Sequence, residues 1–426
     1  MERFTGILGL VLIFGIAFLL SNNRRAINYR LVITGCILQL GTAFFILKIP
    51  IGQVIFAKIG YGITKMLEYS MEGARFCFGF LADGERLNSL LGPGNSWIFV
   101  FTLIPAIIFV CVLVAIGYHI GLLQRVIAIV AQGVYWIMRV SGSEALSNVA
   151  SAFVGQVEAQ ILIRPYISGM TMSELLASMS GSMACIAGGV LAIYVAMGVP
   201  APYLLAASLM AAPGALVISK IVYPETQESE TKGRVKLEVK KTHANLMDAI
   251  SHGASDGMRI SINVIAMLIG VIALVALLDA LLGWLGELIA LTGLNLQVIG
   301  LNLEDLRLKD ILGSFFSLFA WTMGVSWHEA HTVGVLMGTK MVINEFVAYT
   351  DLAPMIASNT LSPKALIIAS FALCGFANFG SVAIQIGGIG ELAPNRRRDL
   401  ARLGIKAMIC GTLASYVSAT LAGMIL

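Results

Sequence analysis

Long apolar runs alternate with short polar stretches along almost the whole chain. A helix that spans a bilayer needs about 20 mostly apolar residues. Runs of this kind predict transmembrane helices at 4–20, 31–49, 97–120, 174–198, 201–222, 260–283, 364–390 and 403–426. The segments 50–90 and 295–315 mix charged with aromatic residues, which predicts amphipathic helices at the membrane surface.

Two further apolar stretches, 143–168 and 325–352, are each interrupted by a polar tip. Apolar arms of about 10–14 residues are too short to span a bilayer singly and are typical of re-entrant or buried segments. Irregular backbone at that depth is tolerated only where it lines a cavity or is buried in protein. We therefore predict an all-α polytopic membrane protein with eight transmembrane helices and two re-entrant hairpins.

Composition agrees with a membrane protein and places its loops. The 426-residue chain is 58% hydrophobic and only 12% charged, whereas soluble domains carry about 25% charged residues. The net charge of +4 does not indicate nucleic-acid binding, because the basic residues fall in short clusters between apolar runs. Such clusters are typical of cytoplasmic loops. They comprise Arg24, Arg25 and Arg30; Lys232, Arg234, Lys236, Lys240 and Lys241; and Arg396, Arg397, Arg398, Arg402 and Lys406. Placing all three in the cytoplasm fits the number of spans between them and puts both termini outside.

The two hairpins open similar halves of the chain. Each hairpin is followed by a helix with a small-residue break, CIAGGVLA at 185–192 or CGFANFGSVAI at 374–384, and then by a closing helix. A basic cluster follows the first closing helix but precedes the second, so the halves have opposite orientations, as in inverted-repeat transporters. The predicted domains are N-terminal scaffold and interfacial helices (1–120), a first repeat (141–222), a cytoplasmic loop with a scaffold helix (223–310) and a second repeat (325–426).

Each hairpin also carries an acidic side chain at its polar tip, Glu158 in GQVEA and Glu345 in NEFVAY. A charge at bilayer depth costs about 2.5–3.5 kcal/mol even on insertion scales, so an intramembrane acid predicts a functional site. Ionised carboxylates accept hydrogen bonds from hydroxyl groups, Gln156 and Asn378 offer both donors and acceptors, and Phe376 offers an aromatic face. This set favours a neutral, hydroxyl-rich, partly aromatic solute.

Structural alternatives exist for each of these acids. A single glutamate at a hairpin tip could instead stabilise a half-helix N-terminus. Glu144 and Glu174 lie near predicted cytoplasmic ends and are interpreted as solvated acids at helix starts. The run WHEAH at 327–331 has the spacing H-E-x-H rather than the H-E-x-x-H of zinc sites, so a polar hairpin arm facing water is the favoured interpretation.

At this level of detail the chain resembles the concentrative nucleoside transporter family. The run GTKMVINEFVAY at 338–349 fits that family's signature, and SFALCGFANFGSVAI at 370–384 and GQVEA are also similar. The likeness extends over nearly the whole chain. The resemblance implies eight transmembrane helices, two re-entrant hairpins and a homotrimer, in which a scaffold holds a transport domain that moves across the membrane like an elevator.

The resemblance also implies a role for each site residue. Gln156 would face the nucleobase, with Val190 lining the base pocket and Val157 standing where the family has a threonine. Glu158, Glu345, Asn378 and Ser381 resemble the ribose-binding set. Phe376 resembles an aromatic side chain that lies beside the ligand and takes part in gating.

The departures from the family pattern concern the coupling ion. The resemblance implies a sodium site at Ser151, Val154, Cys185 and Ile186, of which Val154 and Ile186 supply carbonyl groups. Ser151 replaces an asparagine there and Cys185 replaces a serine, while Gln160 replaces a proline nearby. Sodium prefers oxygen ligands, and a thiol is a poor substitute. Co-transport of either Na⁺ or H⁺ therefore stays open, with Glu158 or Glu345 as a proton carrier.

The sequence thus predicts cation-coupled nucleoside import across a bacterial inner membrane, without a bound cofactor. One alternative is a membrane-embedded enzyme that uses the two glutamates with His328 or His331. Another is an uncoupled nucleoside pore or sensor. The sequence leaves open which nucleosides bind, whether purine or pyrimidine.

Overall fold

The computed structural model describes residues 2–91, 98–231, 244–290 and 306–425, and within these ranges the regular structure is helical. The N-terminal part consists of α1 (Glu2–Leu19), α2 (Tyr29–Leu47), α3 (Pro50–Phe78), α4 (Gly84–Leu91), α5 (Phe99–His119) and α6 (Leu122–Met138). The central part consists of α7 (Gly142–Ser151), α8 (Glu158–Ile161), α9 (Arg164–Ile167), α10 (Met172–Ala184), α11 (Gly188–Ala196), α12 (Ala201–Val222) and α13 (Leu246–Ala290). The C-terminal part consists of α14 (Leu308–Thr322), α15 (Trp327–Val342), α16 (Glu345–Ala357), α17 (Pro363–Leu373), α18 (Phe379–Leu392) and α19 (Arg397–Ile425). The all-α prediction is confirmed for the described residues.

Several described helices are long and apolar enough to cross a membrane. They are Tyr29–Leu47, Met172–Ala196, Ala201–Val222, Ile272–Ile289 and Pro394–Ile425, and the pair Ile104–His119 and Leu122–Met138, bent by 75°, gives one further candidate. The multi-pass architecture is therefore supported, while the total of eight spans stays a prediction.

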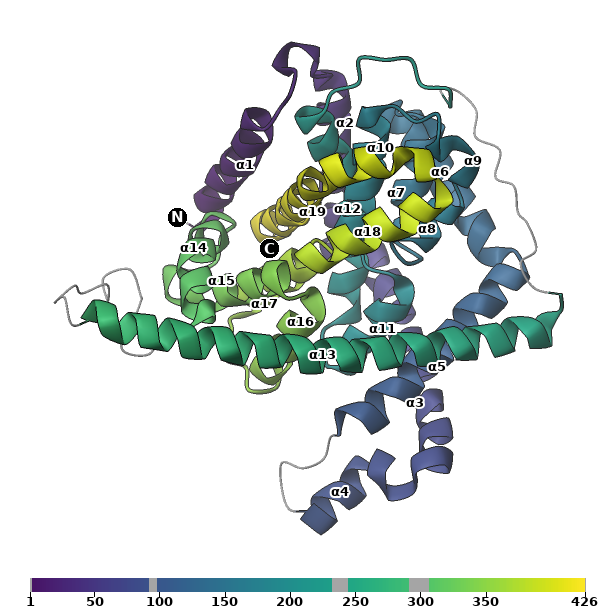
Figure 1. Cartoon of the computed structure of the whole chain (residues 1–426), viewed down its shortest axis with the longest axis vertical. Helices are drawn as coiled ribbons and strands as arrows, with labels where there is room; N and C mark the ends of the chain where they lie inside the picture. The colour runs from purple at the N-terminus through teal and green to yellow at the C-terminus, as the bar shows by residue number, and fades with distance from the viewer. Residues whose placement is uncertain (1, 92–97, 232–243, 291–305, 426) are drawn as a thin grey trace.

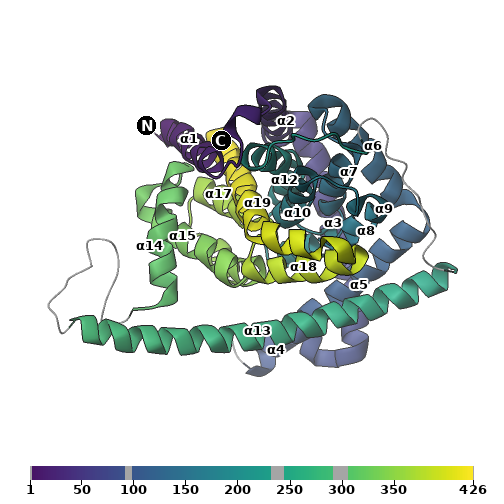
Figure 2. The ribbon, with the colours of Figure 1, turned by 45° about the horizontal axis from the view of Figure 1, so that its top comes forward.

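Two helical features differ from the sequence-based expectation. Helix α6 was not predicted, and α13 has 45 residues, far more than the predicted span 260–283. In both views α13 runs along one face of the molecule, where it packs against α5 (Figures 1 and 2). A Cβ at Gly253 or Gly257 would press on the backbone of α5, so this small-xxx-small pair permits the close approach of the two helices.

The two predicted surface segments are described to different extents. Residues 50–90 form α3, a short 3-10 turn and α4, which project from the main body (Figure 1). Of the segment 295–315, residues 295–305 lie outside the described residues, and the rest opens α14. The second basic cluster, at 232–241, also lies outside them.

Both halves of the chain contain a hairpin, a broken helix and a closing helix in the same order. Hairpin 1 consists of α7, α8 and α9, and is followed by the pair α10 and α11 and by α12. Hairpin 2 consists of α15 and α16, and is followed by the pair α17 and α18 and by α19. The element order agrees with the predicted repeat.

The bases of the two hairpins lie at opposite ends of the closing helices. Helix α12 begins beside hairpin 2, where Pro200 and Tyr203 share a pocket with the segment 359–363. Its last turn carries Lys220, which lies beside the start of hairpin 1. Helix α19 runs the other way: Arg396, just before it, donates to the carbonyl of Ile167 in hairpin 1. This antiparallel pair supports the predicted inversion.

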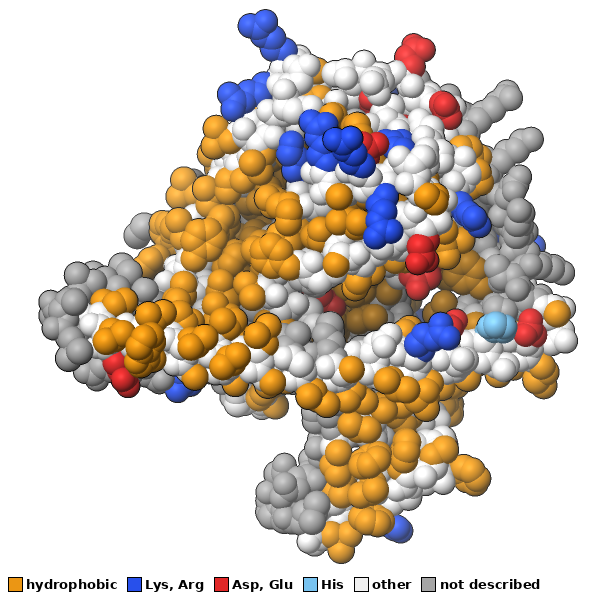
Figure 3. Space-filling view, viewed as in Figure 1, with side chains coloured by type: hydrophobic (Ala, Val, Ile, Leu, Met, Phe, Trp, Pro, Cys, Tyr) orange, Lys and Arg blue, Asp and Glu red, His pale blue; other side chains and the backbone are white. Residues whose placement is uncertain are grey.

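Basic residues gather at the hairpin 1 end of the molecule (Figure 3). The turn after α1 lies there, because the Asn22 amide donates to the Val222 carbonyl at 3.1 Å. Lys406 of α19 lies 6.0 Å from the ring centre of Tyr223 at the same end. The first and third basic clusters are thus on one side of the molecule, while their cytoplasmic placement stays a prediction.

A buried ion-pair network closes the base of hairpin 1. Glu144 and Glu174 cap α7 and α10 in capping boxes, yet each is only 1% exposed, so their interpretation as solvated acids was wrong. Lys220, 5% exposed, forms an ion pair with Glu144 and a second one with Glu225 at 3.3 Å. Thr231 joins them through its carbonyl, which accepts from the Gly142 amide at 3.2 Å. The helix starts are buried because the segment 223–231 covers them.

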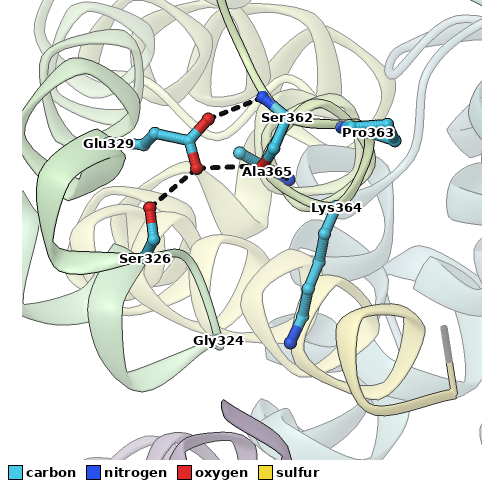
Figure 4. A pocket seen from close by; sticks show the side chains of 7 residues that line it. All are labelled: Gly324, Ser326, Glu329, Ser362, Pro363, Lys364 and Ala365. Carbon is cyan, nitrogen blue, oxygen red and sulfur yellow. Dashed lines mark hydrogen bonds between the residues drawn. The ribbon is translucent and has the colours of Figure 1, made fainter.

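A simpler capping arrangement closes the base of hairpin 2 (Figure 4). Glu329, at the third position of α15, accepts from the Ser326 hydroxyl at 2.7 Å. It also accepts from the Ser362 amide at 2.6 Å and the Ser362 hydroxyl at 2.9 Å, and so ties the start of α17 to the hairpin. The glutamate of WHEAH therefore has a structural role here.

Candidate substrate site

The two broken helices meet at their breaks. Helix α10 ends at Ala184 and α11 starts at Gly188, while α17 ends at Leu373 and α18 starts at Phe379. Gly375 in the second break has φ +106°, and a Cβ there would collide with the Ala184 carbonyl of the first break. Only glycine tolerates both this backbone conformation and this approach. The breaks therefore form one irregular region inside the molecule.

Asn378 and Glu345 lie together beside the second break. Asn378 is the N-cap of α18, where its Oδ1 accepts from the Ser381 amide at 2.8 Å. Its Nδ2 donates to Glu345 Oε2 at 3.1 Å. Glu345, at the tip of hairpin 2, is 6% exposed, and its neighbour Asn344 caps α16 through the Val347 amide. The structure thus brings together three of the predicted ribose-binding residues.

A residue not predicted from the sequence, Tyr194, completes the surroundings of Glu345. Its hydroxyl donates to Glu345 Oε1 at 3.1 Å, so both carboxylate oxygens are hydrogen-bonded. Its ring stacks on Tyr349 with centres 4.2 Å apart, and the Tyr349 hydroxyl donates to the Ser370 carbonyl at 2.8 Å. A buried tyrosine hydroxyl usually finds a partner. The sequence signal that could have identified Tyr194 is the presence of a hydroxyl-bearing side chain within the apolar run of the first broken helix.

The tip of hairpin 1 reaches the second half of the chain through Gln156. The Gln156 amide lies 3.5 Å from the Ser381 hydroxyl, and Gln385 Nε2 lies 3.5 Å from Gln156 Oε1. Gln385, buried in α18, also donates to the Met179 carbonyl at 3.2 Å. Val157 contacts α18 where Gly388 leaves room for its side chain, because a Cβ there would clash. The predicted base-facing residue and the ribose-binding set are therefore contiguous.

The remaining predicted site residues are more open. Val190 and Phe376 are half-buried, in the first turn of α11 and in the second break. Glu158 is exposed, and its carboxylate folds back on Gly155, where a Cβ would collide with it. Among the described residues, a hydrogen bond connects Asn378 to Glu345 and not to Glu158. The two acids therefore have different surroundings.

The four residues of the predicted sodium site also lie close together. The Ser151 hydroxyl donates to the Ser147 carbonyl at 2.7 Å, and the Cys185 thiol lies 3.9 Å from the Asn148 carbonyl. Ser208 of α12 bridges the two segments, with its hydroxyl 3.4 Å from the Ile186 carbonyl and 3.5 Å from the Ala152 carbonyl. Val154, at 4% exposure, lies just beyond Ala152. Hairpin 1 thus contacts the first break.

Gln160 organises a polar network beside these residues. Its Nε2 donates to the Ser182 hydroxyl at 2.7 Å, and its Oε1 accepts from the Ser178 hydroxyl at 2.7 Å. Ser182 in turn lies 2.9 Å from the Ser151 hydroxyl. All four side chains are buried. The serine oxygens that could serve a cation are therefore hydrogen-bonded within the protein.

This region brings polar groups of the two repeats together. A bidentate carboxylate acceptor, an amide and a hydroxyl suit vicinal hydroxyl groups, and a second amide with an aromatic face suits a base. Among the described residues no group of three His, Cys, Asp or Glu side chains lies close enough to hold a metal ion. The site is therefore suited to binding a polar solute.

Most of the chain matches models of known protein families. Residues 203–423 match the family described as Na⁺-dependent nucleoside transporter C-terminus, and residues 8–81 match its N-terminal counterpart. Residues 100–201 match a family described as nucleoside recognition. Together these matches include both repeats.

Similar individual proteins cover the chain almost completely. The nucleoside permease NupC of Helicobacter pylori is 37% identical over 98% of this chain and 96% of its own length. The structure of CNTnw in an inward-facing, substrate-bound state is 39% identical with a TM-score of 0.91, covering 100% of this chain and 98% of that one. A CNTnw variant in an outward-facing state gives the same identity, coverage and TM-score.

Proposed function

Because the chain belongs to the concentrative nucleoside transporter family, we propose that it imports nucleosides across a bacterial inner membrane together with a cation. The matched families and relatives are transporters, so the membrane-embedded enzyme is excluded. The inward-facing and outward-facing structures that it resembles support import by alternating access.

The observation that carries the proposal is the contact of Glu345 with Asn378 and Tyr194 next to the hairpin 1 tip. In the proposed complex Glu345, Asn378 and Ser381 bind the ribose hydroxyl groups. Gln156 and Val157 face the base, with Val190 and Phe376 at its sides. Glu158 joins the ribose from hairpin 1. Its exposed position fits a group that completes the site when substrate enters.

The two repeats act as one transport domain in this proposal. Hydrogen bonds join them at Arg396, at Gln156 and at Glu345, and so hold both hairpins on one body. Helices α3, α5 and α13 form part of a scaffold, which assembles as a homotrimer. The transport domain slides against this scaffold like an elevator, with both termini in the periplasm.

Two cations are candidates for coupling. The family description favours sodium, which would bind between hairpin 1 and the first break. The closed network of Gln160, Ser182 and Ser151 favours the proton instead, because sodium must then compete with hydrogen bonds already satisfied. In that case Glu158 or Glu345 carries the proton with the nucleoside.

Uptake into proteoliposomes with imposed gradients tests these points together. Uridine and adenosine are offered separately under a sodium gradient, a proton gradient or neither. Accumulation against the nucleoside gradient supports coupling and identifies the ion. Equilibration without accumulation indicates an uncoupled pore, and binding without entry indicates a sensor.

A further inference from the structure

Lys340 places a buried ammonium group beside the substrate site. It lies near the end of the first arm of hairpin 2 and is 1% exposed. Its Nζ donates to the Ala372 carbonyl at 2.9 Å and to the Cys374 carbonyl at 3.0 Å. An ammonium group so far from water is costly unless it is well paired. Its position therefore calls for a function.

Both carbonyl groups belong to the C-terminal end of a half-helix. Helix α17 stops at Leu373, so its last carbonyls have no partner within the helix. The aligned peptide dipoles also concentrate negative partial charge at that end. Ser415 of α19 donates to the Cys374 carbonyl at 2.8 Å, but a hydroxyl brings no net charge. The Lys340 ammonium is the cation at this helix end.

The same helix end connects directly to the substrate groups. Four residues after Cys374, Asn378 starts α18 and donates to Glu345. Glu345 follows Lys340 across the tip of hairpin 2, on the next helix of the hairpin. A shift of the α17 end would therefore move Asn378, and a shift of the hairpin tip would move Glu345.

The cation site predicted in the first repeat lies at the position that corresponds to that of Lys340 in the second repeat. There the hairpin 1 tip meets the end of α10, and the Ile186 carbonyl of the first break faces Ser208. In each repeat, a hairpin therefore lies beside buried carbonyl groups at the end of a broken helix. The second repeat differs in that a lysine of its own hairpin supplies the charge.

We propose that Lys340 is a tethered cation, which does at the second break what the co-transported cation does at the first. It joins hairpin 2 to the end of α17 and so sets the distance between Glu345 and Asn378. It is a positioning residue rather than a substrate ligand. The inference rests on the proposed transport function and adds that only the first break needs a free cation.

Chemical rescue tests this inference. Lys340→Ala removes the ammonium and leaves space, whereas Lys340→Met removes it and fills the space. We expect both variants to lose about 10-fold or more in apparent nucleoside affinity, as for one charged hydrogen bond. Added methylammonium or ethylammonium should restore part of the affinity of Lys340→Ala and little of that of Lys340→Met. Lys58→Ala, at an exposed lysine, is the matched control.

Affinity is measured by nucleoside-induced thermal shift and by uptake. Wild-type affinity in Lys340→Met, or a loss in Lys340→Ala that no alkylammonium restores, would overturn the proposal. If Lys340→Ala does not fold, Lys340→Arg is compared with Lys340→Met: the tethered cation requires that Arg, and not Met, retains binding. Absence of uptake by the wild-type protein would instead count against the transport function, since the thermal shifts report on Lys340 independently.

Discussion

Tyr194 of the first repeat donates a 3.1 Å hydrogen bond to Glu345 of the second. The contact fixes one oxygen of the carboxylate, while Asn378 fixes the other. A carboxylate held in this way needs no reorientation when a ligand binds it, so less free energy is spent on ordering it. The geometry of the substrate site therefore depends on how the two repeats pack.

Replacing Tyr194 by phenylalanine removes only this hydrogen bond and keeps the ring stack. A hydrogen bond to a charged group contributes about 1.5–3 kcal/mol, so we expect the apparent KM for uridine to rise about 10-fold or more. Tyr349→Phe is the matched control, because that hydroxyl bonds to the Ser370 carbonyl and not to Glu345. Equal KM values in the two variants would show that Tyr194 does not position the carboxylate.

Replacing the polar groups of the site itself should nearly abolish transport. Glu345→Gln removes the charge that accepts ribose hydroxyls in the proposed complex, and Asn378→Ala removes both the helix cap and the bond to Glu345. Uridine uptake into proteoliposomes should fall to background while expression stays at the wild-type level. Glu391→Gln, at an exposed acid, should transport normally. Full uptake by either site variant would refute the assignment.

Restoring the side chains of the family pattern should favour sodium. In the double variant, Ser151→Asn replaces a short hydroxyl by an amide oxygen, and Cys185→Ser replaces a thiol by a hydroxyl. We expect uridine uptake by this variant to become more strongly stimulated by a sodium gradient than that of the parent protein. Cys410→Ser, at a buried thiol outside both breaks, controls for loss of a cysteine. Unchanged sodium dependence would indicate that these positions do not determine the ion.

Breaking the ion pair at the base of hairpin 1 should destabilise the fold. Removing one partner of a buried pair costs about 3–5 kcal/mol, because the other charge stays buried. Lys220→Met should therefore lower the melting temperature in detergent markedly, and combining it with Glu144→Gln should recover part of the loss. Lys65→Met, which breaks an exposed pair with Glu68, should leave the melting temperature unchanged. Similar losses for both lysines would contradict the buried network.

Gly375 should not tolerate a side chain. Its φ of +106° is strained for alanine, at a cost of about 1–3 kcal/mol, and a Cβ would also strike the Ala184 carbonyl. We expect Gly375→Ala to lower both thermal stability and uptake. Gly387→Ala in α18 has open space around it and should be neutral. The comparison separates a requirement at the crossing of the breaks from a general effect of adding a methyl group.

Periodic and compositional features of the sequence predicted most of the architecture. Apolar runs located the helices, the stretches after Cys185 and Cys374 located the breaks, and the paired tips located Glu345. Helix α6 was missed because its 17 residues are fewer than the length expected of a span, and the full length of α13 because its first turns are polar.

Contacts between distant segments could not be inferred in the same way. Burial of Glu144 depends on the segment 223–231, and the bond from Tyr194 to Glu345 depends on how the repeats pack. Lys340 was visible in the signature, but nothing in the sequence indicated that its ammonium reaches the end of α17. Local pattern specifies elements, whereas the partners of buried charges emerge only from tertiary structure.

The network at the base of hairpin 1 has a consequence for the order in which the protein is made. Its members, from Glu144 to Lys220 and Thr231, are all present once roughly the first half of the chain has left the ribosome. Two other partners of hairpin 1 are synthesised near the end of the chain. They are Gln385, which contacts the hairpin tip, and Arg396, which donates to its base. During biogenesis the base of the first hairpin is therefore anchored early, whereas a chain that stops short of α18 leaves Gln156 at the hairpin tip without its partner Gln385.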